Sequence, residues 1–189
     1  MKAHDDTLAL FIMLGRTVEK LIQDNPETVP PESLEISDTV DLSTALPKLV
    51  WRSNRAALVY KLFFVFENYL RDLVLEILSE KHGEKWWEKV PPNVQTDVAD
   101  LEQTEETKKW MALGSRDKLS LTTYNQLLQI INDCWKEGFD AIIRDKGLIQ
   151  EARLIAHLRN AICHMTDVPD EELERVKQVL RDWFRIVSP

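Results

Sequence analysis

The chain has 189 residues, of which 44% are hydrophobic and 30% charged, and its formal net charge is −8. This length is typical of one domain, or of one domain with an appendage, and the composition excludes wholesale disorder. The negative charge argues against a nonspecific nucleic-acid coat, and the scarcity of glycine disfavours Gly-rich nucleotide loops. Two cysteines, no secretory signal and no apolar run of about 18 residues predict a cytoplasmic protein without a disulfide framework or a membrane span.

The N-terminal half of the chain favours helices separated by one proline-rich stretch. Apolar residues at helical spacing predict a first helix that ends near Asn25, and four of the eight prolines follow closely. We therefore expect two parts: residues 1–47, an N-terminal helix plus a Pro-rich linker, and residues 48–189, a helical domain. Residues 53–81 contain neither Pro nor Gly and predict a long apolar helix, with Gly83 as its C-terminal cap.

The second half of the chain is also typical of helices. Trp86 and Trp87 precede two prolines, and we expect them to cap the core rather than to stack on bases. Helices are predicted over residues 93–112, from Ser120 or Thr122 to near Gly138, over residues 146–164, and after Asp167, where the buried face would hold Val176, Val179, Leu180 and Phe184. No strand alternation lasts and no repeat occurs. The sequence predicts an all-α fold, an up-and-down bundle of four main helices with extra helices.

A short motif near the end of the expected 146–164 helix carries the chemistry. Asn160 and His164 are four residues apart and project from one face of a helix, and Arg159 lies about 100° round from Asn160. Arginine offers paired donors that match two phosphate oxygens, and histidine, with an ordinary pKa of about 6.5, suits proton transfer near neutrality. Buried together, these side chains would leave many donors to satisfy, so we expect them to line a cleft or an interface.

RNA cleavage is a reaction that this trio fits. RNA carries its own nucleophile, the 2′-hydroxyl, and cleavage needs a base, a cation for the crowded phosphorane and an acid for the leaving 5′-oxygen. No metal ion is required in principle. One histidine cannot easily stand on both sides of the phosphate, but two copies of the chain across a two-fold axis can supply one on each side.

Three segments together resemble one protein family. They are Arg159-Asn160 followed by His164, the earlier run Phe66-Glu67-Asn68-Tyr69-Leu70-Arg71, and Gly83 with Trp86-Trp87. Together they resemble the HEPN superfamily over roughly residues 50–187. They are most similar to the branch that includes the C-terminal domain of a nuclear mRNA-surveillance endoribonuclease and many bacterial defence proteins.

The resemblance implies a metal-independent RNA endonuclease that dimerises and forms one composite site from two copies of the motif. Carried over by position, Arg159 and His164 would be catalytic and Asn160 would support them, while Glu67 and Arg71 would lie toward the same cleft in a supporting role. No cofactor or metal is expected. The resemblance also implies a toxin or host-defence role with an inhibitory partner protein, because such roles are common among HEPN proteins.

Other residues near the motif allow simpler interpretations. Arg153 and His157 are RNA-contact candidates, although His157 is better explained as a surface or interface histidine. Glu67 and Arg71 also fit an ordinary i,i+4 salt bridge, which contributes about 0.3–0.5 kcal/mol when exposed. Thr166 stands where HEPN toxins silenced by adenylation often carry tyrosine, so the resemblance does not extend to that mode of control.

Two competing functions stay open. One is a non-catalytic HEPN-type module for dimerisation or for binding protein or RNA, which the acidic net charge favours. The other is a helical adaptor in which residues 1–24 pack on a partner helix. Two catalytic or metal-binding alternatives fail on spacing: Cys163 and His164 point about 100° apart on a helix, and the two cysteines do not have zinc-ligand spacing.

Overall fold

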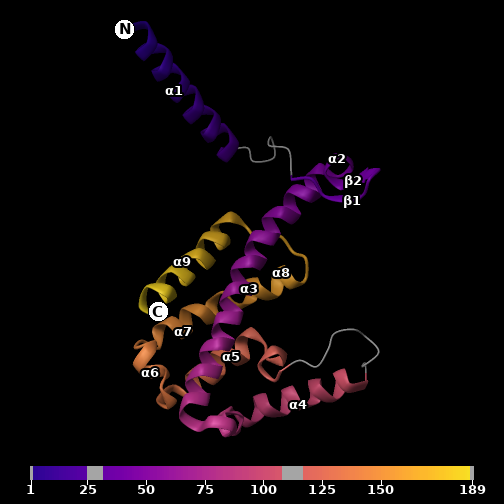
Figure 1. Cartoon of the computed structure of the whole chain (residues 1–189), viewed down its shortest axis with the longest axis vertical. Helices are drawn as coiled ribbons and strands as arrows, with labels where there is room; N and C mark the ends of the chain where they lie inside the picture. Colours follow the sequence, from indigo (N-terminus) through magenta and orange to yellow (C-terminus); the bar gives the residue numbers. More distant parts are fainter. Residues whose placement is uncertain (1, 25–31, 108–116, 188–189) are drawn as a thin grey trace. The chain divides into compact units, whose positions relative to one another are not determined.

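The computed structural model describes residues 2–24, 32–107 and 117–187, shown with their elements in Figure 1. The chain divides into two compact units, Met1–Ala57 and Leu58–Pro189. The long helix α3 (Pro47–His82) begins in the first unit and continues through the second. The boundary expected between residues 47 and 48 therefore falls at the beginning of this helix, and the division at that point stays a prediction.

The first unit consists of a long helix, a small hairpin and a helical turn before α3. Helix α1 spans Lys2–Asp24, the antiparallel strands β1 and β2 span Glu35–Ser37 and Val40–Asp41, and α2 spans Leu42–Ala45. The Asp41 side chain caps α2 by accepting hydrogen bonds from the Ser43 hydroxyl at 2.6 Å and the Ser43 backbone N–H at 2.8 Å, and these bonds lower the pKa of Asp41.

The region expected to be a Pro-rich linker therefore contains a short hairpin and a helical turn from residue 35 onward. An Asx-type cap and a short strand pairing order this stretch locally, although its strands are too short to show a period-2 pattern in the sequence. Residues 25–31 of the expected linker lie outside the described residues.

The second unit is built from helices, which confirms the predicted all-α bundle. In chain order after α3 come the 3-10 helix Gly83–Lys89, α4 (Pro92–Thr107), the 3-10 helix Leu119–Leu121, α5 (Tyr124–Asp133), the 3-10 helix Trp135–Glu137, α6 (Phe139–Ile142), α7 (Gly147–Leu154), α8 (Ala156–Cys163) and α9 (Asp170–Val187). Figure 1 shows α3 crossing this unit, with α9 alongside it.

The core of the second unit forms around α3. Phe66 and Trp183 are fully buried and meet edge to face with their ring centroids 5.2 Å apart, which joins α3 to α9. Tyr124, at the beginning of α5, packs against Phe66 at 6.1 Å and donates its hydroxyl to the Ala152 carbonyl of α7 at 2.9 Å. Helices α5, α7 and α9 are thus joined with α3 in one core. The sequence pattern predicted Phe184 as the buried aromatic residue of α9. In the structure Trp183 is fully buried and Phe184 is only partly buried.

Two predicted helix boundaries are wrong. The helix predicted over residues 146–164 is two helices, α7 and α8, which meet at the fully buried Ile155. No Pro or Gly marks this junction, so tertiary packing decides it. Helix α5 begins after Thr123, which forms a capping box with Gln126, whereas Ser120 lies in the preceding 3-10 helix and the buried Thr122 donates to the Leu119 carbonyl.

The predicted C-terminal ends of the first two helices agree with the structure. Helix α1 ends at Asp24, and α3 ends at His82 before Gly83, whose φ of +55° is the left-handed value that glycine adopts without strain. Helix α4 accounts for the predicted helix to residue 107, and residues 108–112 lie outside the described residues.

Candidate functional site

The carboxylate of Glu67 lies at the centre of the candidate site. Glu67 is only 6% exposed, and it accepts hydrogen bonds from two guanidinium groups. Arg71, one turn later on α3, reaches its Oε1 with Nη2 at 2.5 Å. Arg159, from α8, donates Nε to Oε2 at 3.1 Å and Nη2 to Oε1 at 3.3 Å. The fold thus joins three of the sequence-predicted residues into one charge cluster from two helices.

Arg71 is anchored entirely by protein groups. Besides Glu67, its guanidinium donates to the carbonyl of Leu119 at 2.9 Å, the carbonyl of Thr122 at 3.2 Å and the side chain of Asn68 at 3.2 Å. These bonds tie α3 to the segment that leads into α5. Arg71 therefore holds Glu67 in place and has little capacity left for a ligand.

Arg159 keeps donors for a further partner. Its side chain is 28% exposed, and among the described residues only Nε and Nη2 make hydrogen bonds, so Nη1 offers both of its protons. Partial burial lowers the pKa of Arg159, but the hydrogen bond and charge of Glu67 outweigh it and raise the pKa above its ordinary value. Arg159 is therefore a fixed cation with an open edge, suited to a phosphate oxygen.

Tyr124 gives the cluster a buried, uncharged neighbour. Burial raises the pKa of its phenol far above the ordinary value, and the negative charge of Glu67 raises it further. The phenol stays protonated and donates to the Ala152 carbonyl of α7. The low-dielectric surroundings that this side chain provides strengthen the ion pairs of Glu67.

Asn160 and His164 lie on the surface at the end of α8. His164 is the C-cap of the helix, and its backbone N–H bonds the carbonyls of Asn160 and Ala161, both at 3.1 Å. Within the described part of the chain, neither the His164 imidazole nor the Asn160 side-chain amide makes a hydrogen bond. Both exposed groups remain available to a partner molecule.

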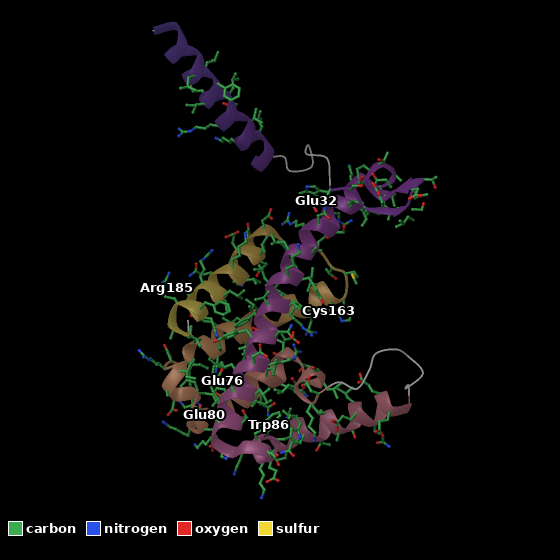
Figure 2. The ribbon with its side chains drawn as sticks, viewed as in Figure 1. Glu32, Glu76, Glu80, Trp86, Cys163 and Arg185 are labelled. Carbon is green, nitrogen blue, oxygen red and sulfur yellow. The ribbon has the colours of Figure 1, made fainter. Side chains whose placement is uncertain are left out.

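The chain turns sharply directly after His164. Met165 has a φ of 59°, and the Thr166 N–H closes back on the Ala161 carbonyl at 3.0 Å, which is a Schellman-type ending with methionine in place of glycine. Figure 2 labels Cys163 at this end of α8. The exposed His164 therefore lies directly beside the sharp turn that ends α8.

The structure does not bring the two RNA-contact candidates into the charge cluster. His157 is exposed, and its ring Nδ1 bonds the Leu154 carbonyl at 2.8 Å. Arg153 is half-buried in α7. Neither hydrogen-bonds with Glu67, Arg71 or Arg159 in the described ranges, so their role as RNA contacts stays a prediction.

Tyr60 and Phe64 lie on the same face of α3 as the charge cluster, and the sequence pattern did not single them out. They precede Glu67 and Arg71 on one face of α3, since residues 60, 64, 67 and 71 are spaced by four, three and four. Both rings are more than half exposed. The sequence pattern treated the whole segment as an apolar helix. The helical spacing of residues 60 and 64 from Glu67 was the signal that could have placed the two rings on the face of the charge cluster.

Two further observations concern metals and membranes. Over the described ranges, no group of three or more His, Cys, Asp or Glu side chains gathers in a way that could hold a metal ion. No helix in those same ranges combines the length and the apolar character that crossing a bilayer requires.

Comparison with known proteins identifies a family. Residues 61–188 match a family described as Swt1-like HEPN, and this range includes the whole Glu67 cluster together with Asn160 and His164. No curated protein and no solved structure matches the chain. The family match covers more than half of the chain and the same helices that the sequence motif singled out.

Proposed function

The chain belongs to the Swt1-like HEPN family, and from this premise we propose that it is a metal-independent endoribonuclease that cuts single-stranded or loop RNA. The observation that carries the proposal is Arg159, a cation fixed by a buried carboxylate with its outer edge free, on the same short helix as the exposed His164. A positioned cation and a solvent-reachable imidazole are two of the groups that phosphodiester cleavage by an internal nucleophile uses.

The proposed reaction uses the 2′-hydroxyl of the substrate. An imidazole takes the 2′-hydroxyl proton, the 2′-oxygen forms a bond to phosphorus, and the bond from phosphorus to the 5′-oxygen breaks. A second imidazole gives a proton to the leaving 5′-oxygen, so the products are a 2′,3′-cyclic phosphate and a 5′-hydroxyl. Arg159 stabilises the charge on the non-bridging oxygens. Unpaired RNA suits this reaction because in-line geometry is hard to reach in a rigid duplex.

The helix geometry supports the proposal that two copies form one composite site. Arg159 and His164 are five residues apart, so their side chains project about 140° apart from α8. One copy therefore directs its arginine toward Glu67 and its imidazole elsewhere. We propose that a homodimer with two-fold symmetry supplies an imidazole to each side of one phosphate, with Asn160 supporting and Glu67 and Arg71 positioning Arg159.

The first test is cleavage by purified protein with and without a chelator. We expect wild-type protein in EDTA to cut a fluorescent single-stranded RNA and leave a 2′,3′-cyclic phosphate end. Arg159→Ala and His164→Ala should each lose at least about 100-fold in rate, because general acid–base and electrostatic stabilisation each contribute on that scale.

The Lys177→Ala variant controls for the preparation, since Lys177 is a partly exposed residue of α9 that pairs with Glu174 and makes no hydrogen bond to the charge cluster in the described ranges. Cleavage at the wild-type rate in both site variants, or cleavage that stops in EDTA, contradicts the proposal.

A non-catalytic module is the second candidate function. The contact between Arg159 and Glu67 is also what a purely structural ion pair between α3 and α8 requires. A folded dimer that neither cleaves nor binds RNA over a range of salt concentrations would favour this function. A toxin or defence role with an inhibitory partner protein is proposed from the HEPN resemblance alone.

A further inference from the structure

The exposed aromatic pair Tyr60 and Phe64 has no role in packing that accounts for it. The rings are 53% and 56% exposed although α3 is the central helix of its unit, and their centroids lie 6.0 Å apart with an interplanar angle of 34°. Isolated exposed apolar residues are common, but a mutually contacting pair of rings beside a charge cluster is less so.

The position of this pair relates it to Arg159. Residues 60, 64, 67 and 71 lie within about 60° of one another around α3, so the rings precede Glu67 on the flank that α8 reaches. Tyr60 lies near enough to Arg159 to be one of the smaller influences on the pKa of Arg159, after burial, Glu67 and Cys163. The exposed Leu58 and Val65 lie about 100° or more away on the opposite flank of α3.

We propose that Tyr60 and Phe64 form a stacking platform for unpaired bases of the RNA strand whose phosphate Arg159 binds. This inference rests on the proposed function and names the recognition element of the same site. A nucleotide presents an anion and a flat apolar face a few ångströms apart, and this flank of α3 offers the matching cation and rings. A purely apolar partner surface would leave the open edge of the Arg159 guanidinium without an acceptor.

The test measures binding in protein that cannot cut. His164→Ala protein is titrated into a 5′-fluorescein-labelled 10-nucleotide oligoadenylate and, separately, into a matched ribose-phosphate strand without bases. Phe64→Leu and Tyr60→Leu should each weaken binding of the oligoadenylate about 10-fold, because stacking contributes about 1–3 kcal/mol per base. Neither should change binding of the strand without bases, and Phe64→Trp should restore binding.

The matched control is Val65→Leu, which alters an exposed apolar residue on the opposite flank and should bind as the parent does. Sedimentation of each variant tests whether a second copy covers the rings instead. The platform would be overturned if the Leu variants lost affinity equally for both strands or bound the oligoadenylate as tightly as the parent. It would also be overturned if a Leu variant became monomeric. If the wild-type protein binds RNA through the two rings but never cleaves it, the platform is retained and the nuclease is rejected. If the protein cleaves RNA with a KM that Tyr60→Leu and Phe64→Leu leave unchanged, the platform is rejected and the nuclease is retained.

Discussion

Glu67 is the residue that connects folding with the proposed chemistry. Its carboxylate is buried and serves two arginines at once, one anchored by carbonyls and one open to solvent. Removing one member of a buried ion cluster leaves the others desolvated and unpaired, which costs more than the pair itself contributes. Glu67 therefore controls both the stability of the α3–α8 contact and the direction in which Arg159 points.

We predict that Glu67→Gln lowers the free energy of unfolding by about 1–3 kcal/mol, since the partly exposed arginines regain some solvent. It should also lower kcat for RNA cleavage more than it changes KM, because a neutral amide no longer holds Arg159 as firmly at the phosphate. Urea unfolding and steady-state cleavage at several pH values measure the two effects.

Glu80→Gln is the control for Glu67→Gln, because it makes the same chemical change at an exposed site on the same helix. It should leave both quantities within about 0.5 kcal/mol of wild type. A Glu67→Gln protein with unchanged stability and unchanged kcat would show that the charge cluster has neither role.

At the scale of elements, the beginning of α5 holds the charge cluster in place. Thr123 caps α5 through a reciprocal box with Gln126, the neighbouring Thr122 carbonyl accepts from Arg71, and Tyr124 packs beside the charge cluster. The N-terminal end of one helix thus fixes the anchor of another. Because Thr123 is exposed, we expect loss of its cap to lower the stability of the fold before it changes the site directly.

We predict that Thr123→Ala lowers the free energy of unfolding by about 1 kcal/mol, the usual contribution of an N-cap hydroxyl. Thermal or urea unfolding checks it. Thr123→Ser keeps the hydroxyl and should retain most of the stability, so equal losses in the two variants would contradict a capping role.

At the scale of the whole molecule, the proposed composite site would make activity a property of the dimer. If one phosphate needs an imidazole from each copy, a dimer with a single His164→Ala chain should be nearly as inactive as one with two. Activity should then follow the square of the wild-type fraction, and equal co-expression should leave about a quarter of the wild-type activity.

Co-purification of two differently tagged chains, with activity measured against composition, checks this prediction. Co-expression with Glu80→Gln chains controls for the tags and should leave activity constant. A linear fall with wild-type fraction would show that each copy works alone, whatever the oligomeric state.

The sequence by itself determined the helical class and the long apolar α3, and its resemblance to HEPN proteins singled out Glu67, Arg71 and Arg159 as candidates. Helical spacing and the Arg159–His164 motif are local signals, and the match to Swt1-like HEPN proteins confirms the family they indicated. Only the tertiary structure decided that Glu67 serves Arg159 as well as Arg71, that α7 and α8 separate at Ile155, and that Tyr60 and Phe64 stay exposed. These features depend on contacts between residues up to 92 positions apart, and the spacing of residues within one helix carries no information about such contacts.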